Sequence, residues 1–231
     1  MLSQFKNKRL KLGKLLQYGD NLTICGNPVA LLKYITGELT TKDGYVEDNC
    51  FSCFTQRDDG IECYTTRFND GECLAGFRSP HNSPNNIVYL INKHPDILQK
   101  YFSKLSDNVI VINGIYTDVQ DRLNGMDFDT DSVFVTNQKD IVDLARKSYS
   151  EYATIINEIP LLGASKYGKD MKSYYDMDYK IALSQNDVGY ASNLAQLALS
   201  YYYDCGLKDN SLLNIFVICS VLAQVAIDSS K

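Results

Sequence analysis

The chain has 231 residues, of which 45% are apolar and 22% are charged, and its formal net charge is −5. This composition is typical of a globular protein, and the negative charge argues against a broad basic surface for nucleic acid, although not against a local basic channel. Seven cysteines, an odd number, and an N-terminus without a secretory signal predict reduced thiols and a cytoplasmic location.

The first part of the chain is expected to form mostly β structure. The basic segment 3–14 is interpreted as a solvated leader or a first strand. A turn, a strand and a second turn follow over residues 18–28, and residues 29–35 have the pattern of a short helix. The polar residues 38–62 are interpreted as a loop or hairpin insertion.

Further strands are predicted from short apolar runs that are bounded by turn residues. These runs cover residues 61–66, 74–77, 87–91, 109–112 and 133–135, and a helix over residues 94–102 is predicted between the third and the fourth. We therefore expect a mainly β region over residues 1–137.

From residue 140 the apolar spacing changes to that of helices. Helices are predicted from Asp140, over residues 174–183, over residues 188–203 and over residues 212–227. The last run is the one candidate for a membrane span, but Asn214 and Gln224 interrupt it and it is short, so we expect a buried helix and no membrane contact. The chain is thus predicted to be α+β, with a helical region over residues 138–231 that packs on the β region.

Four cysteines in the β region could in principle bind zinc, because four thiolates suit its tetrahedral geometry. They are Cys50, Cys53, Cys63 and Cys73. Their spacing is not that of a familiar zinc knuckle, and Cys63 lies in a predicted strand, so the interpretation that we favour is free thiols.

Residues 124–131 read NGMDFDTD and contain the strongest chemical signal of the sequence. In an extended or tightly looped backbone, Asp127, Asp129 and Asp131 fall on one side, where three carboxylates repel one another unless a cation lies between them. Hard cations such as Mg²⁺ prefer oxygen ligands of this kind and share them with substrate phosphates. The alternative is a solvated acidic turn, but the apolar neighbours Met126 and Phe128 argue against full solvation.

This stretch resembles the Asn-Ala-Asp-Phe-Asp-Gly-Asp signature of the two-barrel RNA polymerases, a superfamily that includes the largest subunit of cellular RNA polymerases and the RNA-silencing polymerases. The resemblance implies a double-psi β-barrel whose loop holds the catalytic Mg²⁺ through Asp127, Asp129 and Asp131. Upstream, residues 77–81 read FRSPH and resemble the Asn-Arg-x-Pro segment of the family. By the same resemblance, Arg78, His81 and Asn124 are expected to bind the nucleotide or the RNA.

Two later segments are similar to the single-chain and silencing branch of that superfamily. Residues 187–193 resemble its post-barrel helix, which begins with Gly-x-x-x-Asn, and residues 226–231 resemble its Val-Asp-x-x-Lys element. The family also needs a second barrel that supplies lysines to the nucleotide phosphates, and we find no second barrel here. We therefore expect the catalytic-barrel part of an RNA polymerase that extends an RNA 3′ end from nucleoside triphosphates on a DNA or RNA template, with the other barrel supplied by a second polypeptide or a missing segment.

Position 130 departs from the family signature, because Thr130 stands where the signature has glycine. A threonine fits the Gly-Asp-Thr-Asp-Ser motif of family B DNA polymerases better, so a palm fragment of that type is one alternative. The other alternative is an inactive polymerase-derived domain that binds metal or a partner chain. An EF-hand is excluded, because Ser132 and Gln138 stand where that loop needs glycine and glutamate.

Overall fold

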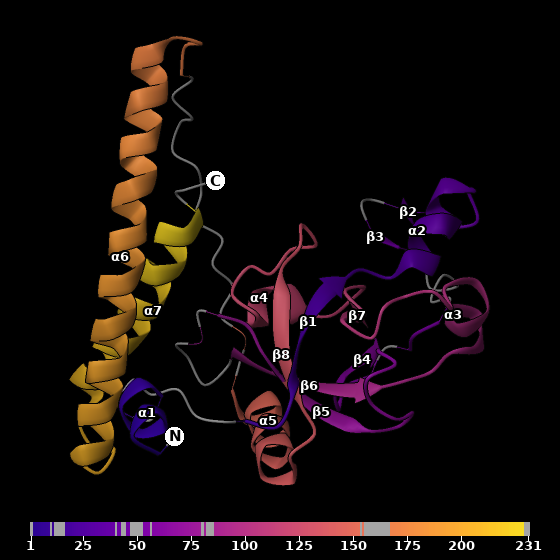
Figure 1. The fold of residues 1–231 in the computed structure, drawn as a ribbon, viewed down its shortest axis with the longest axis horizontal. Coiled ribbons are helices and arrows are strands. Elements are labelled where there is room, and N and C mark those ends of the chain that lie inside the picture. The colour runs from indigo at the N-terminus through magenta and orange to yellow at the C-terminus, as the bar shows by residue number, and fades with distance from the viewer. Residues whose placement is uncertain are drawn as a thin grey trace.

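The computed structural model of the chain describes residues 2–9, 11, 17–39, 41–42, 45–46, 53–55, 57–79, 81, 86–152, 154 and 167–228. Figure 1 shows a β-barrel with short helices around it, beside a pair of long helices that the C-terminal part forms. The elements in chain order are α1 (Leu2–Lys8), β1 (Asp20–Cys25), α2 (Pro28–Ile35), β2 (Thr41–Lys42), β3 (Tyr45–Val46), β4 (Ile61–Tyr64), β5 (Cys73–Phe77), β6 (Ile87–Asn92), α3 (Asp96–Tyr101), β7 (Val109–Ile112), α4 (Val119–Arg122), β8 (Ser132–Thr136), α5 (Lys139–Glu151), α6 (Met171–Asp204) and α7 (Asn210–Asp228).

Six strands close into a barrel in the order β1-β7-β4-β6-β5-β8. The barrel consists of two consecutive three-strand units, β1-β4-β5 and β6-β7-β8, with equivalent pairings. The first strand of each unit pairs with two strands of the other unit. It runs parallel to the second strand of that unit, as β1 does to β7 and β6 to β4, and antiparallel to its third strand, as β1 does to β8 and β6 to β5. The antiparallel pairs β4–β7 and β5–β8 complete the ring. The expected barrel is confirmed, and with it the α+β fold class.

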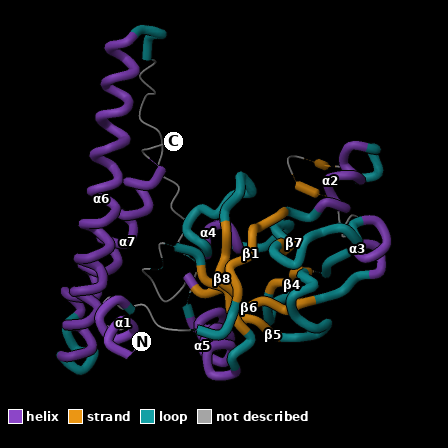
Figure 2. Tube along the Cα trace, viewed as in Figure 1, coloured by secondary structure: helices purple, strands orange, loops and turns teal. Residues whose placement is uncertain are grey.

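The barrel interior is filled by apolar side chains that alternate with exposed ones along β1, where Leu22 and Ile24 point inward. Strands β4, β5 and β6 are buried on both faces, and helix α5 covers β5 and β6. On the outside of β5 and β6, helix α5 buries Val142 and Ala145 against Tyr89. In Figure 2 the strands gather in the barrel and these helices lie around it. A short hairpin, β2–β3, lies within the predicted insertion.

The C-terminal part is a helical hairpin in which α6 and α7 pack on each other. Small residues on α6, Ala195 and Ala198, face Phe216 and Cys219 on α7, which lets the two helices approach closely. The described helices include none that is long and apolar enough to cross a membrane.

One prediction on the helices was wrong. The structure has one helix over Met171–Asp204 where two were predicted, so Gly189 lies inside a helix instead of beginning one. The residues between the two predicted helices, 184–187, continue the same helix, which packs on α7. Residues Leu2–Lys8 form an exposed helix, which is compatible with a solvated leader and not with a first strand.

Candidate metal centre

The acidic loop connects α4 to β8 and turns sharply just before its first aspartate. Asn124 and Gly125 both have left-handed backbone angles, with φ of 56° and 66°, which asparagine and glycine tolerate better than other residues. The turn is closed by a hydrogen bond from the Met126 amide to the Gln120 carbonyl, at 3.0 Å. Met126 is buried in the barrel core, so the loop is anchored where the carboxylates begin.

The loop brings the carboxylates of Asp127, Asp129 and Asp131 together. One oxygen of each lies within 4.8 Å of the others. Asp131 also accepts a hydrogen bond from the Asp127 amide at 3.0 Å, and its own carbonyl accepts one from Ile24 in β1 at 2.8 Å. Oxygens that share one Mg²⁺ at 2.0–2.1 Å lie roughly 3–4 Å apart. Small side-chain rotations would therefore suffice for a hard cation, and the donor set fits Mg²⁺.

Arg78 joins this loop to the end of β5. Its Nη2 lies 2.9 Å from Oδ2 of Asp131, and its Nη1 donates to the carbonyls of Leu123 and Asn124 at 3.0 and 2.9 Å. The Arg78 side chain is only 12% exposed. Its guanidinium group thus contacts both the turn and the last carboxylate, and it balances part of the negative charge that gathers in the loop.

A second anchor of the loop, Asn86, was missed by the sequence analysis. The side-chain amides of Asn86 and Asn124 bond reciprocally, with Nδ2 to Oδ1 distances of 2.8 and 3.2 Å. Asn86 also donates to the Arg122 carbonyl at 3.1 Å, and it is almost fully buried. No local motif marks this residue, because its partners are 36 and 38 positions further along the chain.

Helix α7 also reaches the turn of the acidic loop. A Cβ atom added at Gly125 would lie 2.8 Å from Nε2 of Gln224, which is buried. This contact explains why a glycine suits position 125 on steric grounds as well as on its φ angle. The C-terminal hairpin therefore touches the candidate site directly.

Phe128 and Thr130, the residues between the aspartates, have unlike surroundings. The Phe128 ring lies over the backbone of Gly26 and Gly114, where added Cβ atoms would be 3.5 and 3.6 Å from it, and it remains 44% exposed. Thr130 has φ of 103°. This angle is costly for a β-branched residue, whereas a glycine would adopt it freely.

Arg78 and Asn124 contact the acidic loop directly, whereas His81 is linked to it through a hydrogen bond with the backbone of Asn86. The His81 ring packs edge-on against Phe77, with ring centres 5.4 Å apart. The surrounding chain desolvates the imidazole and lowers its pKa, although the side chain as a whole is exposed, so the neutral form predominates at pH 7.

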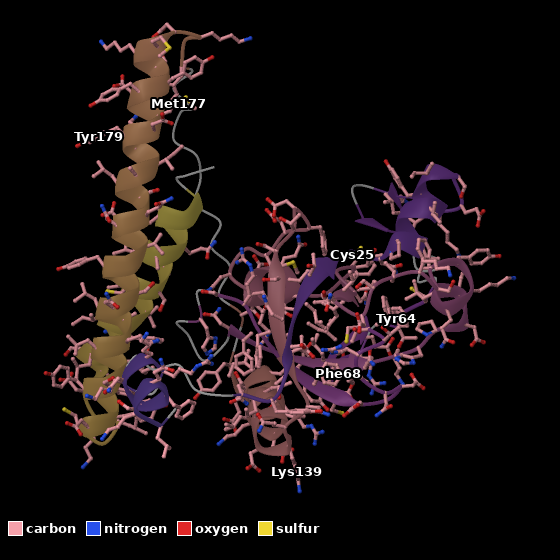
Figure 3. All side chains as sticks on the ribbon, in the orientation of Figure 1. Cys25, Tyr64, Phe68, Lys139, Met177 and Tyr179 are labelled. Atoms are coloured by element: carbon pink, nitrogen blue, oxygen red, sulfur yellow. The ribbon has the colours of Figure 1, made fainter. Side chains whose placement is uncertain are left out.

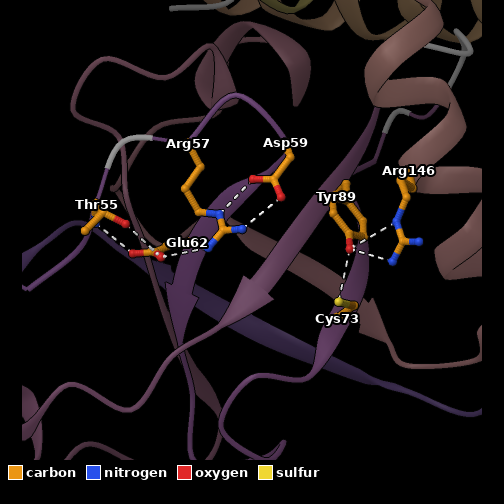
Figure 4. Close-up of polar contacts among 7 residues, drawn as sticks. All are labelled: Thr55, Arg57, Asp59, Glu62, Cys73, Tyr89 and Arg146. Atoms are coloured by element: carbon orange, nitrogen blue, oxygen red, sulfur yellow. Dashed lines mark hydrogen bonds and ion pairs between the residues drawn. The ribbon is translucent and has the colours of Figure 1, made fainter.

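Of the four cysteines considered for zinc, the three that the structure describes, Cys53, Cys63 and Cys73, contact Asn27, Asn92 and Tyr89 respectively. Sγ of Cys53 lies 3.3 Å from Oδ1 of Asn27, and Cys63 is fully buried, which raises the pKa of its thiol. Cys73 accepts a hydrogen bond from the Tyr89 hydroxyl at 3.0 Å, and Arg146 donates to the same hydroxyl oxygen at 2.9 Å (Figure 4). Burial is the main reason why the pKa of Tyr89 is raised. Cys50 lies outside the described residues.

Comparison with known proteins places the fold. No protein-family model matches the sequence, and no curated protein matches it. Among solved structures, the chain is similar to the RNA-dependent RNA polymerase QDE-1 from Thielavia terrestris, with a TM-score of 0.58 and 16% sequence identity. The match covers 99% of this chain and 24% of that one. The chain thus spans about a quarter of that polymerase and shares the fold of the matched part.

Proposed function

We propose that this chain is the catalytic-barrel part of an RNA polymerase and transfers nucleotides to an RNA 3′ end. The observation that carries the proposal is the convergence of Asp127, Asp129 and Asp131 on a barrel loop, with Arg78 paired to the last of them. The likeness in fold to QDE-1, which is an RNA-dependent RNA polymerase, supports the same reaction class. An acidic turn that is merely solvated would not need a buried arginine and a buried amide pair to set its shape.

The three aspartates would hold Mg²⁺, and a bound Mg²⁺ would lower the pKa of the RNA 3′-hydroxyl and stabilise the charge that develops on the α-phosphate. Arg78 fixes Asp131, and Asn124 fixes the turn, so we assign both to positioning of the carboxylates. His81, neutral and exposed, is our candidate for a direct hydrogen bond to the nucleotide or the RNA.

The partners that follow are nucleoside triphosphates, a template strand of DNA or RNA, and the RNA product. Because the chain spans about a quarter of QDE-1, we propose that a second polypeptide or further segment supplies the other barrel and its lysines. Within the chain, we propose a catalytic barrel over residues 1–137 and a helical region over residues 138–231 that packs on it.

One alternative draws on a specific observation. The positive φ of Thr130 and the ion pair between Arg78 and Asp131 are also what an inactive derivative would show, one that keeps the loop to bind a metal or a partner chain. The alternative of a family B DNA polymerase palm gains no support from the closed barrel or from the structural likeness.

The test uses the full chain, alone and together with neighbouring gene products, on a primed RNA or DNA template with labelled nucleotides and Mg²⁺. We expect Mg²⁺-dependent primer extension that Asp129→Ala abolishes. The exposed Asp143 on α5 provides the control, since Asp143→Ala should extend the primer as the parent chain does.

Binding of Mn²⁺, followed by its electron paramagnetic resonance signal, separates the active polymerase from the inactive derivative. Mn²⁺ binding that Asp129→Ala removes, without extension in any combination, would favour the inactive derivative. Extension that survives Asp129→Ala would rule out the proposed mechanism.

A further inference from the structure

Helix α6 has two apolar faces, and the structure accounts for one of them. The face that packs on α7 is made of small residues, among them Ala191, Ala195 and Ala198. On the opposite side, six large side chains are 43–69% exposed; this outer stripe consists of Tyr175, Tyr179, Leu183, Tyr190, Leu197 and Tyr201. Figure 3 shows Tyr179 pointing away from the barrel.

The spacing of the outer stripe follows the helix. Successive members are 4, 4, 7, 7 and 4 residues apart, and these intervals are close to one or two helical turns. The six side chains therefore form one row that runs roughly 39 Å along the helix, at 1.5 Å per residue. A continuous row of this kind is typical of a helix that pairs with another helix.

We propose that the outer stripe is the interface of an antiparallel homodimer, in which α6 of one copy pairs with α6 of a second copy. The stripe runs from Tyr175 to Tyr201, so its midpoint is residue 188. An antiparallel pair centred there places Tyr175 against Tyr201 of the second copy, and Tyr179 against Leu197 of the second copy. A symmetric pair of this kind needs a surface that complements itself when reversed. The two ends of the stripe meet this condition, and at the centre Leu183 and Tyr190 would face Asn193 and Asn186 of the second copy.

A pair of opposite charges beyond the apolar row fits this pairing. Lys172 and Asp204 lie beyond opposite ends of the stripe and at equal distances from the midpoint, so each would face its opposite charge on the second copy. Both are exposed.

The area and the charge both favour a second protein chain over nucleic acid. Exposed side chains of this size present roughly 100 Å² each, so two stripes would bury on the order of 1,200 Å², the lower end of specific interfaces. Between Met171 and Asp204 the helix carries two lysines and four aspartates, a balance that would repel a phosphate backbone.

The test is the mass of the full chain in solution, measured by light scattering after size exclusion at micromolar concentration. We expect twice the mass of one chain. Tyr190→Glu, near the centre of the stripe, should raise the dissociation constant at least about tenfold, because it buries a charge at the interface. Tyr203→Glu is the matched control: Tyr203 lies on the same helix and is 60% exposed, but it is outside the stripe, so the dimer should persist.

The orientation is tested by charge exchange. Lys172→Glu should weaken the dimer, and adding Asp204→Lys should restore it, with circular dichroism at 222 nm showing that the helices remain. A monomeric parent chain would overturn the proposal, as would a dimer that Tyr190→Glu leaves intact. Failure of Asp204→Lys to rescue Lys172→Glu would overturn the antiparallel register. These measurements use no nucleotide and are independent of polymerase activity.

Discussion

Arg78 and Asp131 form an ion pair of 2.9 Å although they lie 53 positions apart in the chain, and the same guanidinium group also donates hydrogen bonds to the carbonyls of Leu123 and Asn124. One arginine at the end of β5 thereby sets both the start and the end of the acidic loop. The family resemblance suggests that Arg78 reaches the nucleotide, and this stays a prediction; in the structure its guanidinium group supports the Asp131 carboxylate.

Replacing Arg78 with lysine keeps the charge but loses the forked geometry that reaches two backbone carbonyls and a carboxylate at once. We expect Arg78→Lys to lower the free energy of unfolding by about 1–3 kcal/mol, as is usual for lost hydrogen bonds to charged groups. Urea unfolding would measure it. Arg9→Lys, at an exposed position, should change stability by less than about 0.5 kcal/mol. Equal effects of the two substitutions would contradict the role of Arg78.

The amide pair of Asn86 and Asn124 gives a second prediction. Asn86→Ala would remove three hydrogen bonds that Asn86 makes with the Asn124 amide and the Arg122 carbonyl in a buried site, and each is worth about 1 kcal/mol. We expect a loss of at least about 2 kcal/mol in urea unfolding, together with weaker Mn²⁺ binding because the turn loses its shape. Asn108→Ala, at an exposed position, is the control; a similar loss there would show that the effect is not specific to the loop.

The backbone of Thr130 predicts a stabilising substitution. A β-branched residue at φ of 103° stores strain of about 1–3 kcal/mol, and Thr130→Gly would release most of it. Glycine also raises the entropy of the unfolded chain, which favours unfolding and offsets part of this gain. We therefore expect a net stabilisation of about 1 kcal/mol in thermal unfolding. Thr36→Gly should do the opposite, because Thr36 has an ordinary φ of −81°. A destabilised Thr130→Gly variant would mean that the threonine side chain holds the loop.

His81 predicts how stability depends on pH. Its pKa is lowered in the folded chain, chiefly by desolvation. In the unfolded chain the imidazole keeps its ordinary pKa, so as the pH falls through about 6.5 the unfolded chain binds the proton first and stability drops. We expect the melting temperature to fall less between pH 7.5 and pH 5.5 for His81→Gln than for the parent chain. Identical slopes would show that His81 titrates alike in both states.

The sequence predicted those features that depend on neighbouring residues. The apolar run Val109–Ile112 became a buried strand, and the alternate aspartates converged, because a strand and a tight loop depend on residues that are close in the chain. The two residues that support the acidic loop, Arg78 and Asn86, could not be predicted from neighbouring residues. Arg78 was named only through a family resemblance and Asn86 was not named, because their partners are far along the chain. The predicted gap at residues 184–187 is absent from α6, where packing against α7 outweighs local propensity.

The exchange of strands between the two units of the barrel has a kinetic consequence. Strand β1 pairs with β7 and β8, which begin 89 and 112 residues after it, and β4 pairs with β6 and β7. Neither unit can satisfy its own hydrogen bonds before the other is present, so we expect no stable half-barrel on the way to the native state. Pairings this distant make folding slow. On a ribosome, the barrel cannot close until β8 has emerged, and β1 must wait with both edges unpaired.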